Sequence, residues 1–264
     1  MVKTLNKLYK PITIGLWKSS SEWQFVWFNQ DKKVFSQQFV DLDLNHLLEA
    51  VSESVESYTD LDECHFVTAI LPHHLWIKTL ILPQSMTADE VEQQCRYLLQ
   101  NEIPVPLEDI WFDFLLTKLP LGVRIDIFVI LKKVACDYVE TLDPVKINIL
   151  DSATNALQYA WNYLLEQNGF TPDTDYLLLY QDEDQCIALM EQVQRTLVLE
   201  QKSFNLNQLH QDFCKKYDVQ PKKIFFYQKV LSDEQIPSDW IQISTTLPLI
   251  ALGNALWKRP DYLQ

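Results

Sequence analysis

The chain has 264 residues, of which 47% are apolar, and it carries a formal net charge of −14 at pH 7. This apolar content is enough for a buried core in one large domain or in two smaller lobes. Acidic residues outnumber basic ones by 36 to 22. This excess argues against direct binding of nucleic acid, because phosphate backbones are bound by clustered Lys and Arg.

Other features that the sequence lacks narrow the function further. No run of about 18 consecutive apolar residues is present, and the N-terminus lacks the apolar core of a signal peptide, so we expect a cytoplasmic protein. The five cysteines lie at wide spacing without a C-x-x-C pair, which predicts reduced, mostly buried thiols. Only four glycines are present, whereas average usage gives roughly 18, so several glycine-rich phosphate loops are not expected.

The first 71 residues predict the order strand, strand, strand, helix, strand. The strands are rich in apolar and aromatic residues, and turn formers at 29–32 separate the second strand from the third. Five apolar residues of the helix recur at helical spacing. The predicted strands span 12–17, 23–28, 34–39 and 65–71, and the helix face consists of Leu44, Leu47, Leu48, Val51 and Val55.

The segment 78–114 contains a helix whose start is well specified. Thr87 caps the first turn, and Glu90 three residues later completes a capping box. Met86 and Val91 occupy the two positions of a hydrophobic staple. Acidic residues crowd the first turn, where they favour the positive end of the helix dipole.

Two prolines, Pro104 and Pro106, prevent this helix from continuing into the apolar strand predicted at 110–116. Alternating side chains of that strand lie on opposite faces, so we expect one aromatic face to pack inward and the other to help line a groove. The two faces are Trp111 with Asp113, and Phe112 with Phe114.

The rest of the chain predicts a second unit with the order of the first, after a connecting region and a turn-rich linker at 167–175. The connecting region comprises a strand at 124–131, a helix at 134–142, a strand at 145–150 and an alanine-rich helix from 151 to about 167. The second unit comprises strands at 176–180, 186–190 and 196–200, a helix at 205–217 and a strand at 223–227, and a helix at 247–257 ends the chain.

Two βββαβ units joined by a crossing helix, with a small insert in the first, resemble the actin-like (ribonuclease H-like) ATPases. The resemblance implies an α/β fold of duplicated βββαβ units with a small α+β insert in the first half. It places the first lobe at 1–170, with the insert at about 75–132, and a reduced second lobe at 171–264. The insert is similar to that of the PilM-type proteins of type IV pilus assembly. The residues that carry this similarity are 70–72, 78–83, the acidic helix after Met86 and Thr87, 103–104, 106–108, 113–114 and, farther on, 148–157.

The short length and degenerate loops look most like the competence-type relatives of that family, the ComA and HofM proteins. The resemblance implies a scaffold of the pilus or DNA-uptake machinery, held beneath the inner membrane by a partner. That partner is a PilN-like inner-membrane protein, whose N-terminal cytoplasmic tail is gripped in a groove between the first subdomain and the insert. The residues expected to contact the tail are Ile103, Pro104, Pro106, Trp111, Phe112 and Phe114.

In actin-like ATPases, nucleotide phosphates lie on the turn between the first two strands of each half. Here Gly15 is kept in the first half, but Trp17 stands where the family carries an Asp. Lys18, Ser19 and Ser20 are the nucleotide-binding candidates of that turn, with an ordinary polar hairpin as the alternative. Asp151 is the remaining candidate, and a helix N-cap is the alternative role that we favour for it.

The second turn, at 181–185, has three carboxylates and no glycine, which repel a phosphate and predict a solvated acidic hairpin. The residues expected beside an adenosine, at 227–230, also lack glycine. His73 and His74 are adjacent and do not share a metal easily, so no metal site is expected. We therefore predict no enzyme activity and no cofactor. An ATP-binding switch or ATPase of the same machinery, using ATP and magnesium, stays open as the alternative.

Overall fold

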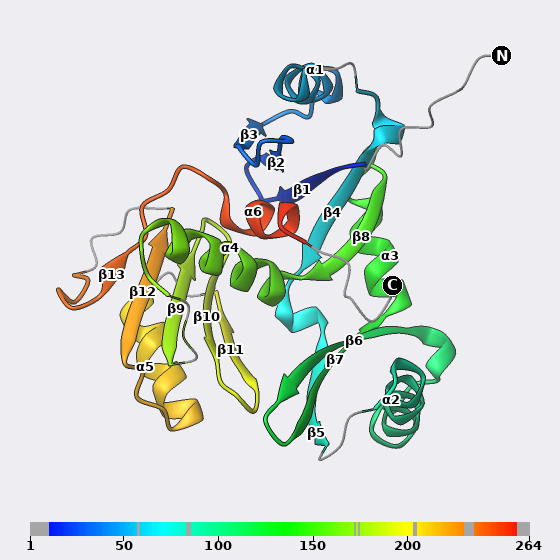
Figure 1. Ribbon diagram of the computed structural model, residues 1–264, viewed down its shortest axis with the longest axis vertical. Helices are drawn as coiled ribbons and strands as arrows, with labels where there is room; N and C mark the ends of the chain where they lie inside the picture. The colour runs from blue at the N-terminus through cyan, green and yellow to red at the C-terminus, as the bar shows by residue number, and fades with distance from the viewer. Residues whose placement is uncertain are drawn as a thin grey trace.

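The computed structural model describes residues 11–56, 59–82, 86–171, 173, 175–202, 205–229 and 235–257. Three sheets organise these residues (Figure 1). Three segments used in the sequence analysis lie partly outside the described residues: the PilM-like segment 78–83 at Pro83, the linker at 167–175 at Pro172 and Thr174, and the adenosine-contact residues at Val230.

The first sheet has the strand order β3-β2-β1-β4-β8, with β1 antiparallel to β2 and parallel to β4. Helix α1 covers one face, where Leu47 and Val51 are buried against Phe25 and Phe66 of the sheet. The elements are β1 (Ile12–Lys18), β2 (Trp23–Phe28), β3 (Val34–Phe39), α1 (Leu44–Val55), β4 (Cys64–Ile70) and β8 (Ile147–Ser152), with a short 3-10 helix η1 (Leu61–Glu63) before β4.

The second sheet repeats this arrangement with the order β11-β10-β9-β12-β13, and helix α5 packs on its outer face. The two βββαβ units predicted from the sequence are therefore present. The two-residue strand β13 was not predicted. The elements are β9 (Tyr176–Gln181), β10 (Cys186–Glu191), β11 (Thr196–Gln201), α5 (Leu206–Tyr217), β12 (Lys223–Gln228) and β13 (Ile241–Gln242).

The insert is a three-stranded antiparallel sheet with the order β5-β7-β6, covered on one face by α2. The predicted capping box of Thr87 and Glu90 is present at the start of α2, and Met86 and Val91 pack in the same apolar cluster. The elements are β5 (Trp76–Leu82), α2 (Ala88–Glu102), β6 (Ile110–Leu119) and β7 (Gly122–Leu131), with η2 (Pro72–His74) before β5, η3 (Leu107–Asp109) before β6 and α3 (Lys132–Glu140) after β7.

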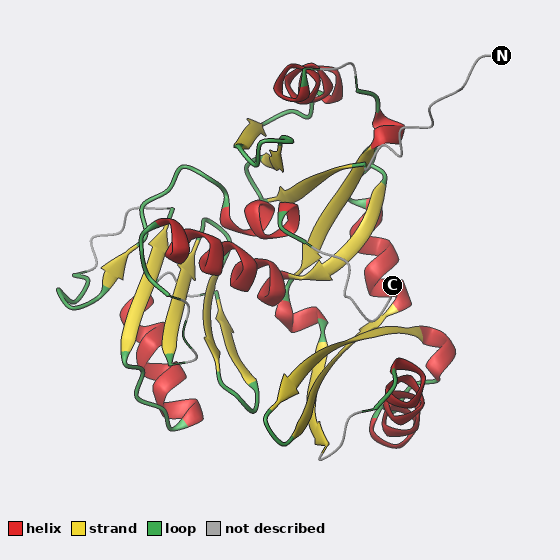
Figure 2. Cartoon of the chain, in the orientation of Figure 1, coloured by secondary structure: helices red, strands yellow, loops and turns green. Residues whose placement is uncertain are grey.

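Helices α4 (Ala153–Gln167) and α6 (Leu249–Ala255) lie between the first and second sheets (Figure 2). One apolar cluster joins Val26 and Ala69 of the first sheet, Trp161 of α4, and Leu178 and Ile187 of the second sheet. The two halves thus share a core. The predicted lobe boundary at 170–171 stays a prediction, because α6 follows the second sheet in the chain but packs against β1 and β2 of the first.

The prediction that Asp151 caps α4 is wrong. Asp151 is still extended and pairs with Ala69 in β4, so the helix begins later. Ser152 is the N-cap, and its hydroxyl accepts a hydrogen bond from the backbone N–H of Thr154 at 3.2 Å.

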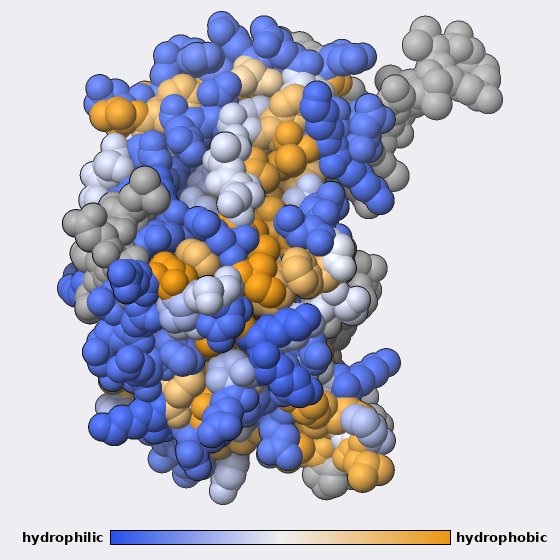
Figure 3. Space-filling model, turned by 90° about the vertical axis from the view of Figure 1, so that its left-hand side faces the viewer, coloured by the Kyte–Doolittle hydropathy of each residue, from blue (hydrophilic) through white to orange (hydrophobic). Residues whose placement is uncertain are grey.

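Hydrophilic residues cover most of the face drawn in Figure 3, with an apolar band down its middle. Among the described residues, no helix is long and apolar enough to cross a bilayer.

Two glycines, Gly15 and Gly253, allow the backbone of α6 to pack directly against the backbones of β1 and α4. A Cβ on Gly253 would lie 1.7 Å from the carbonyl oxygen of Ala156 in α4, and a Cβ on Gly15 would lie 2.0 Å from the carbonyl oxygen of Ala251. Gly15 thus has a packing role, and its presence in β1 is no sign of a phosphate loop.

We predict that Gly253→Ala lowers the free energy of unfolding by about 3 kcal/mol or more, because the added methyl group meets backbone that cannot give way. Urea unfolding followed by circular dichroism measures the change. Gly169→Ala is the matched control: nothing lies within 4 Å of the added methyl, so only the positive φ of 77° opposes it, at about 1 kcal/mol. Equal costs for the two substitutions would contradict this packing account.

Candidate functional site

The two turns that hold phosphates in actin-like ATPases contact each other directly in this chain. They are residues 19–22, between β1 and β2, and residues 182–185, between β9 and β10, and we call them the paired turns. The backbone N–H of Ser20 donates to Asp184 Oδ2 at 2.8 Å, and the hydroxyl of Ser21 donates to Glu183 Oε1 at 2.8 Å. Hydrogen-bond donors of the first turn are therefore already bonded to carboxylates of the second turn.

Lys229, which follows β12, ties the paired turns together. Its Nζ lies 2.6 Å from Glu22 Oε1 and 3.1 Å from the carboxylate of Glu183. Partial burial opposes ionisation of Glu183, but hydrogen bonds from serine hydroxyls and from Lys229 outweigh it and lower its pKa from 4.5 to about 2. Burial also opposes the charge on Lys229, and its hydrogen bonds to Glu22 and Glu183 raise its pKa. In this cluster, Lys229, Glu22 and Glu183 form their ion pairs and hydrogen bonds with other groups of the same chain.

The second turn is not the solvated hairpin that its carboxylates predicted. Asp182 is buried, where its carboxylate accepts hydrogen bonds from the hydroxyl of Tyr180 at 2.7 Å and from the backbone N–H groups of Asp184 and Gln185 at 2.9 Å. The turn is therefore folded around one buried carboxylate and presents the next two to the first half.

The four residues predicted to bind nucleotide are not brought together. Ser19 and Ser20 belong to the paired turns. Lys18 points elsewhere, because its Nζ donates to the carbonyl of Thr141 at 2.7 Å and lies 4.4 Å from the ring centroid of Trp23. Asp151 lines a different cavity. Trp17, at the position of the family's Asp, is 4% exposed and belongs to the core shared by both halves.

The second candidate site is a cavity of about 200 Å³ between the insert sheet and the first sheet, which we call the insert groove. Most of its lining is apolar or aromatic, and it lies where the tail-binding groove was expected. Its lining includes Trp111, Leu115 and Phe128 of the insert, Ile70 and Asp151 of the first sheet, and Tyr159 of α4.

The three aromatic residues of β6 that were expected to contact the tail, Trp111, Phe112 and Phe114, all line the insert groove. Phe114 is also buried in the core of the insert, and Phe112 packs against that core. Trp111 is 48% exposed, lines the insert groove and shares its strand face with Asp113.

The other residues expected to contact the tail do not line the insert groove. Ile103 is the C-cap of α2 and packs against the insert core, whereas Pro104 and Pro106 are exposed at the start of the segment that leads to η3. Whether any of these residues contacts a partner stays a prediction.

Two carboxyl groups give the insert groove a negative character. Burial raises the pKa of Asp151 to about 6; hydrogen bonds from Asn155 and from the backbone of Ser152 oppose the shift, and the nearby charge of Asp113 adds to it. Asp113 is exposed as a residue, but loss of water around its carboxyl raises its pKa, against a hydrogen bond from the N–H of Phe114. A cation in the groove would favour the ionised form of both groups.

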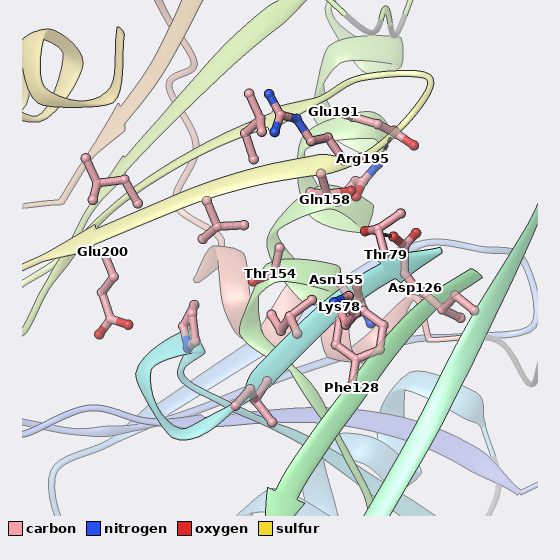
Figure 4. A pocket seen from close by; sticks show the side chains of 18 of the residues that line it. Lys78, Thr79, Asp126, Phe128, Thr154, Asn155, Gln158, Glu191, Arg195 and Glu200 are labelled. Carbon is pink, nitrogen blue, oxygen red and sulfur yellow. Dashed lines mark hydrogen bonds between the residues drawn. The ribbon is translucent and has the colours of Figure 1, made fainter. Parts of the chain in front are cut away.

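A larger cavity of about 780 Å³ adjoins the insert groove, and we call it the polar cleft (Figure 4). It lies between the insert sheet, α4 and strand β11 of the second sheet. Arg124 of β7 is buried at its edge, where Nε donates to Asp126 at 2.8 Å and Nη1 donates to the carbonyl of Gln192 at 2.7 Å. Glu191 contacts both Arg124 Nη2, at 3.3 Å, and Gln158 of α4.

The insert is thus tied to the second half by a buried ionic network that sequence reasoning missed. A second tie joins His73 Nδ1 to Glu200 Oε1 at 2.7 Å. The sequence carried one sign of this network. Arg124 and Asp126 are two residues apart in an otherwise apolar strand, so their side chains lie on the same face of the sheet.

Within the described ranges, no group of three or more His, Cys, Asp or Glu side chains is arranged to hold a metal ion. The geometry offers a groove with apolar walls, two carboxylates and a wide polar extension. Such a surface can bind a peptide segment.

Comparisons with known proteins identify the fold. No protein-family model matches the chain, and no curated protein sequence matches it. Among solved structures, the cytoplasmic domain of EpsL, an inner-membrane component of the type II secretion system of Vibrio cholerae, has a TM-score of 0.55 and 15% identity, over 96% of this chain and 97% of that one.

Two more distant structures have TM-scores below 0.5. The PilM–PilN type IV pilus biogenesis complex gives 0.48 at 16% identity, over 80% of this chain and 67% of that one. A Bacteroides thetaiotaomicron protein with an actin-like ATPase fold gives 0.44 at 14% identity, over 88% and 87%. At 15% identity the likeness to the EpsL domain establishes the fold alone, and together with the two five-stranded sheets it confirms the predicted actin-like α/β fold of duplicated βββαβ units.

We predict that Glu183→Gln destabilises the chain at pH 7 by roughly 1 kcal/mol, a value discounted for partial exposure of the carboxylate. The folded-state pKa lies below the ordinary value, so the ionised group stabilises the fold above pH about 4.5, and this contribution is lost as the pH falls toward 2. Urea unfolding at pH 7 and pH 3 should therefore show a smaller difference between variant and wild type at pH 3. Glu108→Gln, at an exposed site outside the turns, is the control. A pH-independent difference would contradict the pairing of the turns through this charge.

Proposed function

We propose that this chain is a cytoplasmic scaffold of an inner-membrane machine of the type IV pilus or type II secretion class. In this proposal it binds the N-terminal cytoplasmic tail of a PilN-like membrane protein and is held beneath the membrane through that partner. The likeness to the EpsL cytoplasmic domain over nearly the whole of both chains supports the class of machine. The resemblance of the 78–114 segment to the PilM-type insert supports the kind of partner.

The observation that carries the proposal is the insert groove. It provides an apolar cavity, a half-exposed indole at Trp111 and two carboxylates, Asp113 and Asp151, at one place on the surface. Aromatic side chains are frequent anchors of protein interfaces. The carboxylates favour a segment that carries a positive charge, and cytoplasmic flanks of membrane proteins are enriched in Lys and Arg.

The paired turns support a role that does not depend on nucleotide. A bound phosphate needs backbone N–H groups and cationic side chains that are free to contact it. Here the N–H of Ser20, the hydroxyl of Ser21 and the ammonium group of Lys229 already contact carboxylates of the chain. We therefore infer that the protein is not an enzyme and uses no cofactor, in preference to an ATP-driven switch of the same fold.

Within this class we propose a pilus of the competence type, which takes up DNA, because the degenerate nucleotide loops of the chain resemble those of the ComA and HofM proteins. The acidic charge of the chain means that DNA contact belongs to other components of such a machine. Deletion of the gene should then abolish natural transformation, with restoration by the wild-type gene.

We predict that the purified chain binds a synthetic peptide of the PilN-like tail in isothermal titration calorimetry, and that Trp111→Ala weakens binding at least about tenfold, as expected for an aromatic anchor. Tyr97→Ala is the matched control, because Tyr97 is an aromatic residue of the insert that is 69% exposed and does not line the groove. Loss of binding in both variants, or in neither, would place the tail elsewhere. No binding to the wild-type chain would remove the proposal.

A further inference from the structure

The insert groove and the polar cleft form one continuous surface. Five residues line both cavities: Leu75, Leu115, Phe128, Asn155 and Tyr159. The shared wall is the face of the insert sheet that α2 does not cover, and the opposite wall is α4. A segment that enters the insert groove therefore has a path along α4 to the edge of the second sheet.

We propose that the partner segment continues from the insert groove into the polar cleft as an extended chain, and that the cleft binds its main chain and does not read its side chains. This inference rests on the proposed function, because it concerns the same tail. The inference extends the binding site into the polar cleft. Because the cleft binds only main chain, the part of the tail that lies in it is free to vary in sequence.

The first supporting observation is a buried hydroxyl without a partner. Thr154 is 3% exposed, its side chain lines the polar cleft, and its Oγ1 has no hydrogen-bond partner among the described residues (Figure 4). Burying a hydroxyl without a hydrogen bond is costly, so such a group is commonly satisfied by a ligand or by water. A peptide group supplies both a donor and an acceptor for it.

The second observation is a polar row on α4. Thr154, Gln158 and Asn162 recur every four residues, which places them on one helix face, and all three line the cleft. Gln158 is held in place by its bond to Glu191. Amide side chains carry the same donor and acceptor groups as a peptide bond and therefore match an extended main chain.

The third observation is the open edge of the second sheet. Strand β11 pairs with β10 on one side, and its residues from Thr196 to Glu200 line the polar cleft. One of its carbonyls, that of Val198, accepts a hydrogen bond from the hydroxyl of Tyr217. Edge strands offer further N–H and C=O groups to an added strand, a recurring way of binding peptides.

The charge of the cleft fits an uncharged main chain. Its lining has four basic residues, Lys78, Arg124, Arg195 and Lys216, and three acidic ones, Asp126, Glu191 and Glu200. This near balance contrasts with 22 basic and 36 acidic residues in the whole chain. A phosphate or another strongly charged ligand would find no net attraction there.

The test compares two synthetic peptides of the PilN-like tail, its full cytoplasmic length and its N-terminal half, by calorimetry with the wild-type chain and with Thr154→Val and Asn162→Leu. We expect the long peptide to bind wild type about tenfold more tightly than the short one, and each variant to weaken only the long peptide, by about three- to tenfold. Alanine substitutions in the second half of the long peptide should change little, whereas N-methylation of its backbone should remove the advantage.

Thr154→Val also separates binding from folding. The hydroxyl has no hydrogen-bond partner among the residues that the structure describes, so its removal should leave the melting temperature unchanged or higher. Equal affinity of the two peptides would overturn the inference and leave the proposed function standing. Failure of both peptides to bind would overturn the proposed function itself. Sensitivity to alanine in the second half of the peptide would show that the cleft reads side chains, against the inference.

Discussion

The close packing of α6 between the two sheets is the constraint on which the rest of the structure depends. Gly15 and Gly253 let α6 lie against the backbone of β1 and α4, and apolar residues of both sheets close around the two helices. Because this core belongs to both halves at once, it fixes the distance between them. The paired turns at one end and the polar cleft at the other are consequences of that fixed distance.

At the paired turns, the two halves meet through the chain's own charges. Ser20 and Ser21 donate to Asp184 and Glu183, and Lys229 neutralises part of the negative charge that these groups bring together. An arrangement in which a nucleotide joins the halves would have to break these bonds first. The insert, by contrast, leaves one sheet face uncovered by α2, and Thr154, whose buried hydroxyl has no partner among the described residues, lines the same space. The insert groove and the polar cleft, of about 200 and 780 Å³, therefore give a peptide segment a continuous surface beside the insert.

Elements with strong local signals were predicted well from the sequence, and contacts between distant segments were not. The bounds of β2 and β3 and the capping box at Thr87 follow from alternation and from residues three apart, so they needed no tertiary information. The role of Asp151 was missed because pairing with β4 keeps it extended, and only Ser152 is then placed to cap α4. The hydrogen bond from Ser20 to Asp184 joins residues 164 positions apart in the sequence, and neither turn contains a pattern that predicts it.

Hydrogen–deuterium exchange of the full chain, alone and with either the PilN-like tail peptide or millimolar Mg-ATP, tests the central claim most directly. The account predicts that the peptide slows amide exchange in β6, β7 and the first half of α4, and that Mg-ATP changes no segment. Protection of the paired turns, residues 19–22 and 182–185, by Mg-ATP, with no protection beside the insert by the peptide, would contradict it.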